Sequence, residues 1–308
     1  MKLMIKGQKG CCNTEYSQLQ EWTTKMELKA RAKINLGLDV VRRLENGYHE
    51  VRMIMQTIDL YDELSFQRRQ DPDIILSSDN RALPMGSNNL IFKAAKMMKE
   101  QYSIKEGIEI SLKKKIPIAA GMAGGSTDAA ATILAMNEMF ELGQSHEELC
   151  KKAVAIGADV PFCIMGGTAL AEGIGEKLTS VPTPPDAYIL IAKPPISVPT
   201  VMVYQNLHVD TISHHPDIDA VLKALENKDL QGICSNIENI LEHVTIPLHP
   251  EIQTIKDHMM EQGAMTSLMS GSGPTVFGIY QKKEDAENAM EVIRKTGLAK
   301  DLAVTTFA

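Results

Sequence analysis

The chain has 308 residues, of which 44% are hydrophobic and 23% charged, an ordinary composition for a soluble globular protein. Its length exceeds the usual size of one domain, so we expect two domains that share a cleft. The net charge of −7 argues against a nucleic-acid-binding protein, which normally carries a basic excess. No apolar run approaches the roughly 20 residues needed to span a bilayer, so no membrane partner is expected either.

Cysteine usage indicates a reducing compartment. The five cysteines are an odd number, and they are scattered except for the adjacent Cys11 and Cys12. No Cys-x-x-Cys motif or Cys/His cluster has metal-ligand spacing, which argues against disulfides and structural zinc. The N-terminus also lacks the apolar core of a signal peptide, so we predict a cytoplasmic protein. Residues 1–25 show no clear periodicity and are assigned no function.

Residues 27–40 alternate between polar and apolar side chains almost without a break. This period of two predicts a half-buried antiparallel strand or hairpin arm. It places Lys33 and Asn35 side by side on the polar face, roughly 7 Å apart from the strand rise. A surface strand with solvated lysines would show the same pattern.

Further turns, helices and strands follow, and beyond the proline-rich region their alternation suits a β/α sandwich. Asn46-Gly47 predicts a hairpin turn, with a return strand that begins at Tyr48-His49 and continues to residue 58. Apolar periodicity separates the remaining helices from the strands. Helices are expected at residues 88–102, 146–156, 217–226 and 251–262, and strands at 108–112, 166–171, 187–192, 267–269 and 276–280. Six prolines within residues 182–199 indicate the crossing between the two domains.

The most informative stretch is the glycine-rich segment 116–131. Gly121, Gly124 and Gly125 allow positive φ and close backbone approach, and Ser126 can cap the helix that follows. Unpaired N–H groups and the helix dipole then point the same way, so we expect this loop to bind an anion such as phosphate. Three lysines at 113–115 concentrate positive charge just before it. The spacing matches neither a P-loop nor Gly-x-Gly-x-x-Gly, and a tight turn with a capped helix is the alternative interpretation.

Phosphoryl transfer needs a phosphate cradle, a cation and a group that orients or deprotonates the acceptor hydroxyl. Lys33 is the best-placed cation, since no P-loop lysine follows the glycines. Asp159 lies in a Gly-Ala-Asp-Val-Pro turn, where it can be either a catalytic base or a capping residue. The Ser126 hydroxyl could reach a phosphate-bound Mg²⁺, and no other metal ligand is predicted. A second glycine cluster at 270–275 fits ligand contact and simple strand-loop geometry equally well.

Three blocks resemble the galactokinase/homoserine kinase/mevalonate kinase/phosphomevalonate kinase (GHMP) superfamily: residues 32–36, 117–130 and 269–275. Within it, the chain resembles the family of 4-diphosphocytidyl-2-C-methyl-D-erythritol kinases. The segments that carry this narrower resemblance are 32–35 (Ala-Lys-Ile-Asn), 46–49 (Asn-Gly-Tyr-His), 157–162 and 171–176. The resemblance covers nearly all of residues 26–308. The chain departs from the family pattern at two positions. Met122 stands where the family usually has leucine, which preserves size, and Thr127 stands where it often has serine, which preserves the hydroxyl group.

The resemblance implies an α+β, two-domain small-molecule kinase with its active site in the cleft between the domains. Residues 26–183 would form the ATP-binding α/β domain and residues 184–308 a ferredoxin-like domain. The enzyme would use ATP and Mg²⁺ to phosphorylate the tertiary 2-hydroxyl of a cytidine diphosphate alcohol, in the methylerythritol phosphate route to isoprenoids. Its partner would be this small molecule alone, and the protein would be a monomer or homodimer.

The same resemblance assigns roles to individual residues. Asp159 matches the catalytic aspartate, and Lys33 matches a catalytic lysine that lowers the effective pKa of the hydroxyl. Tyr48 and Tyr204 match aromatics that sandwich cytosine, and His49 matches the group that reads its polar edge. Asn35 and Thr200 match contacts near the methylerythritol end and the diphosphate. The expected ATP-binding residues are Pro117, Ala119, Ala120, Gly121, Met122, Ala123, Gly124, Gly125, Ser126 and Thr127.

Two other functions are compatible with parts of the sequence. A kinase for a small alcohol such as homoserine or mevalonate is disfavoured by Tyr48 and Tyr204, because an aliphatic alcohol needs no pair of stacking rings. A catalytically silent nucleotide-binding member of the same fold is disfavoured by the presence of both Lys33 and Asp159. The fold alone does not choose among them.

Overall fold

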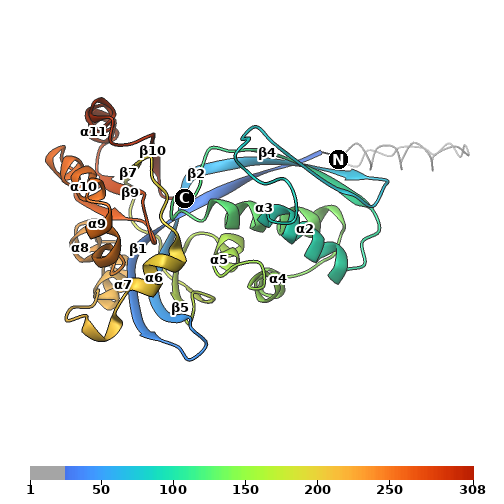
Figure 1. Ribbon diagram of the computed structural model, residues 1–308, viewed down its shortest axis with the longest axis horizontal. Helices are drawn as coiled ribbons and strands as arrows, with labels where there is room; N and C mark the ends of the chain where they lie inside the picture. The colour runs from blue at the N-terminus through green and yellow to red at the C-terminus, as the bar shows by residue number, and fades with distance from the viewer. Residues whose placement is uncertain (1–24) are drawn as a thin grey trace, which may run out of the picture.

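The computed structural model describes residues 25–308, so nearly all of the predicted N-terminal extension, including Cys11 and Cys12, lies outside the described residues. Two sheets, each with its own helices, lie next to each other along the long axis of the molecule (Figure 1). The combination of helices and largely antiparallel sheets confirms the predicted α+β class. No helix within residues 25–308 is long and apolar enough to cross a bilayer.

A long antiparallel hairpin connects the two halves of the fold. It consists of β1 (Lys25–Arg43) and β2 (His49–Arg69), and its register closes with Arg43 opposite His49. The hairpin predicted at Asn46-Gly47 is confirmed, with Gly47 at φ +85° in the turn. In Figure 1 these two strands run from the first sheet to the region beside the second one.

The central part of β1 differs from the predicted half-exposed strand. Residues 32–40 are buried on both faces, with Lys33 only 5% exposed. Register shifts between Arg31 and Lys33 and between Asn35 and Gly37 interrupt the alternation. Helices α3 (Gly124–Met139) and α7 (Ile218–Glu226) both contact this strand. The interpretation of Lys33 as a solvated surface lysine is therefore wrong, because segments distant in the sequence cover its strand.

The first sheet has the order β3-β4-β2-β5-β6, with β1 on the free side of β2, and only the β3–β4 pair is parallel. Its remaining strands are β3 (Ile74–Ser78), β4 (Gly107–Lys113), β5 (Thr168–Glu172) and β6 (Lys177–Ser180). The accompanying helices are α2 (Leu90–Gln101), α3 (Gly124–Met139), α4 (His146–Ala153) and α5 (Val160–Met165). The predicted helices at 88–102 and 146–156 and strands at 108–112 and 166–171 are confirmed, whereas β3, β6 and α5 were not predicted.

The second sheet is antiparallel and has the order β10-β7-β9-β8. Its strands are β7 (Tyr188–Lys193), β8 (Thr266–Met269), β9 (Val276–Tyr280) and β10 (Asp301–Thr306). The helices of this half are α6 (Thr200–Asn206), the 3-10 turn η1 (Val209–Thr211), α7 (Ile218–Glu226), α8 (Leu230–Asn236), α9 (Glu242–Leu248), α10 (Glu251–Glu261) and α11 (Lys283–Thr296). The domain limits at 183 and 184 fall between β6 and β7 and stay a prediction.

One apolar cluster joins the hairpin to the second sheet. Leu38 and Met53 from the hairpin pack in the same buried cluster as Leu190 and Met269 from the second sheet. Burial of apolar side chains is the main favourable term in folding, so this shared core fixes the two halves relative to each other.

The two glycine-rich loops contact each other directly. Gly121 has φ +70°, and a Cβ built on it would lie 2.2 Å from the carbonyl oxygen of Ser270. The Ser270 hydroxyl donates a hydrogen bond to the Gly121 carbonyl at 3.0 Å. Only glycine fits at position 121, both for its backbone angle and for the lack of space.

We expect Gly121→Ala to destabilise the protein more than Gly143→Ala. Both glycines have positive φ, which costs an alanine about 1–2 kcal/mol, but nothing lies within 4 Å of a Cβ at Gly143. At Gly121 the clash with Ser270 adds an overpacking cost of about 1–3 kcal/mol. Urea denaturation of the two variants measures this difference. Equal midpoints would show that the loops can separate without cost.

Candidate functional site

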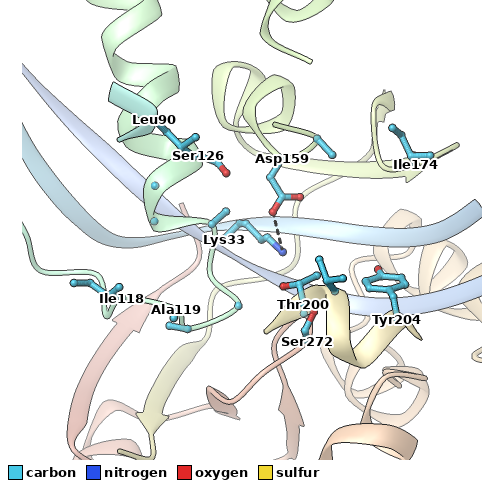
Figure 2. A pocket seen from close by; sticks show the side chains of 18 of the residues that line it. Lys33, Leu90, Ile118, Ala119, Ser126, Asp159, Ile174, Thr200, Tyr204 and Ser272 are labelled. Carbon is cyan, nitrogen blue, oxygen red and sulfur yellow. Dashed lines mark ion pairs between the residues drawn. The ribbon is translucent and has the colours of Figure 1, made fainter. Parts of the chain in front are cut away.

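A cavity of about 940 Å³ lies where the two halves meet. Its walls come from the β1–β2 hairpin, the first glycine-rich loop, the residue before α5, helix α6 and the second glycine-rich loop (Figure 2). Ligand sites are typically concave pockets of this kind, with a few convergent polar groups. It holds most of the predicted site residues, namely Lys33, Tyr48, His49, Pro117, Ala119, Ala120, Gly121, Ala123, Gly124, Gly125, Ser126, Asp159, Thr200 and Tyr204.

Lys33 and Asp159 form an ion pair on the cavity wall. The Lys33 Nζ lies 3.9 Å from the Asp159 Oδ2 and donates a hydrogen bond to the Asn35 Oδ1 at 2.9 Å. The side chain of Lys33 is 6% exposed and that of Asp159 is 34% exposed. Asp159 is the residue before α5, yet its carboxylate makes no capping hydrogen bond. The alternative interpretation as a capping residue is therefore wrong, and the carboxylate faces Lys33.

The first glycine-rich loop has an unusual backbone. Ala119 and Ala123 have φ 51° and 56°, and Gly121 has φ 70°. Non-glycine residues rarely adopt such angles, and they concentrate at functional sites when the surroundings hold them there. Helix α3 begins directly after Ala123, so its first free N–H groups lie at the cavity. Such a helix start is suited to binding a phosphate.

Two expectations about this loop are wrong in detail. Ser126 does not cap α3, because the helix already begins at Gly124 and its N-cap residue is Ala123. Gly124 and Gly125 are helical and have no positive φ. Glycine is nevertheless favoured at position 124, since a Cβ there would lie 3.0 Å from the Lys114 Nζ.

Lys114 lies in a buried charge network beneath the loop. Its Nζ pairs with Asp62 and with the Asp128 Oδ2, the latter at 2.9 Å, and all three side chains are at most 4% exposed. Asp62 also accepts hydrogen bonds from the backbone N–H groups of Lys115 and Ile116, at 2.6 and 2.8 Å. Burial raises the pKa of Asp128 although Lys114 opposes this shift. The network thus fixes the segment that leads into the loop.

The positive charge predicted at 113–115 is therefore compensated locally. Lys114 is paired as described above, and both Lys113 and Lys115 pair with Glu63. The sequence alone does not show that carboxylates of the neighbouring strand β2, those of Asp62 and Glu63, lie beside this run of lysines. These lysines are not a free phosphate-attracting patch.

The opposite end of the cavity carries aromatic side chains. Tyr48 is 60% exposed beside the hairpin turn, and the His49 and Tyr204 rings lie 5.2 Å apart at an angle of 40°. Burial and the nearby charge of Arg43 lower the pKa of His49, so its imidazole is neutral at pH 7. Burial and Asp159 raise the pKa of Tyr204, which keeps its hydroxyl protonated. Thr200, at the start of α6, lines the wall between this end and Lys33.

Three predicted site residues do not line this cavity. Asn35 is fully buried, with its Oδ1 bound to Lys33 and its Nδ2 bound to the Met53 sulfur at 3.3 Å. Met122 is also fully buried, and its carbonyl accepts a hydrogen bond from the Lys33 N–H at 3.2 Å. Thr127 lines a separate cavity of about 450 Å³. Asn35 and Met122 thus hold Lys33 in position.

The structure also adds residues that sequence reasoning missed. Asn89 and Leu90 line the cavity beside the start of α3, and Arg43, Ile174 and Val201 line it near the aromatic end. The Asn89 side chain caps α2 by accepting a hydrogen bond from the Ile91 N–H. An asparagine directly before an amphipathic helix predicts such a cap. It does not predict that the same residue lines the cavity.

Comparisons with known proteins agree with this architecture. Residues 89–167 match the GHMP kinases N terminal domain, and residues 214–298 match the GHMP kinases C terminal domain. A crystal structure of 4-(cytidine 5'-diphospho)-2C-methyl-D-erythritol kinase superposes with a TM-score of 0.79 at 32% identity, covering 92% of this chain and 99% of that one. A homoserine kinase from Cytophaga hutchinsonii has the same fold, with a TM-score of 0.72 at 20% identity. The match covers 99% of this chain and 96% of that one.

Curated relatives narrow the family. The 4-diphosphocytidyl-2-C-methyl-D-erythritol kinase of Lachnospira eligens is 51% identical over 280 residues, which are 91% of this chain and 97% of that protein. The kinase of the same name from Bacillus subtilis is 47% identical over 266 residues, 86% of this chain and 92% of that protein. With this identity over most of its length, the chain belongs to the family of 4-diphosphocytidyl-2-C-methyl-D-erythritol kinases within the GHMP kinases.

Proposed function

We propose that this protein transfers the γ-phosphoryl group of ATP to the 2-hydroxyl of 4-diphosphocytidyl-2-C-methyl-D-erythritol, in the methylerythritol phosphate route to isoprenoid precursors. One observation carries the proposal beyond family membership. The Lys33–Asp159 pair lies in one cavity between the first glycine-rich loop and an aromatic end (Figure 2). ATP and an alcohol with a nucleobase can thus approach the pair from opposite ends.

The nucleotide would occupy the end formed by the first glycine-rich loop. Figure 2 shows Leu90, Ile118 and Ser126 on the side of Lys33 that is opposite to Tyr204. The helix start at Gly124 would bind the phosphates through its N–H groups. Leu90 and Ile118 supply apolar surface for the purine ring next to it.

The transfer itself needs one base and one cation. Asp159 would accept the proton of the 2-hydroxyl as its oxygen bonds to the γ-phosphorus and the bond to the ADP oxygen breaks. The Lys33 ammonium would favour loss of that proton and offset the charge on the transferring group. The product is the monophosphate ester of the alcohol, and ADP leaves.

We further propose that Mg²⁺ arrives with ATP and is held mainly by its phosphates. The oxygen donors at the loop fit this ion: the Ser126 hydroxyl lines the cavity, and the Asp128 Oδ1 has no hydrogen-bond partner among residues 25–308. No cluster of three or more metal-binding side chains occurs in that part of the chain. When bound, Mg²⁺ supplies charge neutralisation on the phosphate oxygens.

The aromatic end would select the substrate. Tyr48 and Tyr204 offer ring faces for cytosine, and base–aromatic stacking is worth about 1–3 kcal/mol in nucleic-acid complexes. Neutral His49 offers one donor and one acceptor nitrogen, which can match the polar edge of cytosine. Thr200 would contact the diphosphate. Asn35 would hold the Lys33 ammonium in position beside the methylerythritol end of the substrate.

The cellular setting is also a proposal. The three described cysteines are free thiols, which suits a reducing cytoplasm. The net charge of −7 favours a small-molecule partner over nucleic acid. We propose that the protein works there as a monomer or homodimer.

The proposed activity is tested by ADP release with the cytidine diphosphate alcohol, with mevalonate and homoserine assayed in parallel. We expect turnover only with the first substrate. Faster turnover of mevalonate or homoserine would contradict the proposal and indicate a small-alcohol kinase. No turnover of any of the three substrates would indicate a catalytically silent member of the fold.

Asp159→Asn should keep the fold and ATP binding but reduce kcat by roughly 100-fold or more, because asparagine has the same shape and does not accept the hydroxyl proton. Asp210→Asn, at an exposed position in η1, is the matched control and should retain full activity. Near-normal kcat in a folded Asp159→Asn protein would contradict the role of this residue as a base.

Lys33→Met should also reduce kcat by roughly 100-fold or more, while the free energy of unfolding falls by only about 1–3 kcal/mol, the cost of leaving the buried Asn35 Oδ1 without its donor. Methionine fills the buried space of the lysine stem, and Asp159 remains partly exposed to water. Lys29→Met on the same strand is the control. The Lys29 ammonium lies over the Tyr61 ring, so its loss leaves the Lys33–Asp159 pair unchanged. If the Lys33 variant unfolds while its soluble fraction keeps full activity, the assignment is wrong.

Binding of cytidine should weaken as the pH falls below the pKa of His49. That pKa is lowered from its ordinary value of about 6.5, so His49 is neutral at pH 7 and becomes protonated only in more acidic solution. The protonated ring has no acceptor nitrogen and adds positive charge near Arg43. Titration calorimetry with cytidine between pH 5 and 8 measures this dependence, which His49→Gln should remove. An unchanged pH profile in that variant would assign the dependence to another group.

A further inference from the structure

The cavity contains few positive charges, and most of them are already paired. Within residues 25–308, the lining side chains that carry a full positive charge are Lys33, Arg43 and Lys114. Lys33 pairs with Asp159 at the point of transfer, and Lys114 is buried between Asp62 and Asp128. Neither ammonium is available for a second anion elsewhere in the cavity.

Arg43 is the remaining cation. It is the last residue of β1 and lies opposite His49 in the hairpin register. Its guanidinium forms no ion pair with a carboxylate in the described part of the chain, whereas Arg42 pairs with Glu50. Arg43 is exposed, lines the cavity, and is close enough to lower the pKa of His49. Its charge therefore acts at the aromatic end.

The proposed substrate brings a diphosphate into this region. The diphosphate joins the cytidine to the alcohol, so it lies between a base held near Tyr48 and His49 and a hydroxyl held at Lys33. A diphosphate that loses contact with water needs a compensating cation. Arginine is the side chain best suited to phosphate, because its planar group donates two parallel hydrogen bonds.

We propose that Arg43 binds the diphosphate of the cytidine diphosphate alcohol and so selects a nucleoside diphosphate over an uncharged alcohol. The proposal rests on the proposed function for the identity of the substrate. Arg43 is a binding residue and takes no part in the transfer, which occurs at Lys33 and Asp159. Its neighbour Arg42 cannot replace it, because successive residues of a strand point to opposite faces and Arg42 is held by Glu50.

The test uses CDP and cytidine as probes in titration calorimetry, because they differ only in the diphosphate. The variants are Arg43→Gln and Arg43→Lys, with Arg42→Gln as the matched control. We expect Arg43→Gln to weaken CDP binding about 10-fold or more and cytidine binding less than about 2-fold, as expected for loss of charge-assisted hydrogen bonds. Arg43→Lys should recover part of the loss, and Arg42→Gln should bind both probes like the unaltered protein.

Steady-state kinetics provide the second measurement. Arg43→Gln should raise KM for the cytidine diphosphate alcohol by a similar factor, with kcat and the KM for ATP unchanged within about 2-fold. A loss of equal size for CDP and cytidine would overturn the proposal, since it would show that Arg43 only supports the hairpin and the base. Unchanged CDP binding in Arg43→Gln would overturn it as well.

The proposed function and this proposal can fail separately. If the unaltered protein does not phosphorylate the cytidine diphosphate alcohol, the proposed function is wrong, whereas the difference between CDP and cytidine binding still decides the role of Arg43 without turnover. If the unaltered protein binds neither probe, both are wrong.

Discussion

The contact between Gly121 and Ser270 is the constraint on which the site depends. It places two glycine-rich loops, 149 residues apart in the chain, in hydrogen-bond contact. Asn239 fixes the second loop by donating from its Nδ2 to the carbonyls of Met269 and Gly271, each at 2.8 Å. The first glycine-rich loop is thereby held against the second half of the molecule. Because the cavity walls come from both halves, its shape depends on this contact.

The distribution of charge inside the cavity follows from the cost of burial. A buried ammonium without a partner is unfavourable, and the structure provides carboxylates for the two buried lysines that line the cavity, Lys33 and Lys114. Lys114 is paired twice and acts as a structural cation that holds Asp62 and Asp128 below the loop. Lys33 is paired loosely, at 3.9 Å, and keeps its charge directed into the cavity. Exposed Arg43 requires no such compensation from the protein, so its charge remains available to a ligand.

The helices and strands that have a regular pattern of apolar residues could be predicted from the sequence. Features that depend on contacts between distant segments could not. The β1–β2 hairpin, α2 and α4 follow from local patterns. In contrast, β6 is exposed at three of its four residues and α5 is apolar along all six, so neither shows an alternation of polar and apolar side chains. Burial of Lys33 was not predictable from alternation, because distant helices cover its strand. Likewise, the need for a small residue at Gly124 arises from the position of Lys114, which no local rule for glycine reveals.

The Lys33–Asp159 pair combines a fixed cation with an accessible carboxylate. Asn35 and the Met122 carbonyl hold Lys33 at its side chain and its backbone, so the ammonium is in place before any substrate binds. Asp159 is used neither as a helix cap nor in a short ion pair, so its oxygens retain free lone pairs for a hydroxyl proton. Its side chain is 34% exposed, which in the proposed reaction would allow it to return that proton to water after each turnover. A base buried as deeply as Asp128 would hold its proton more tightly, since burial favours the neutral carboxyl group.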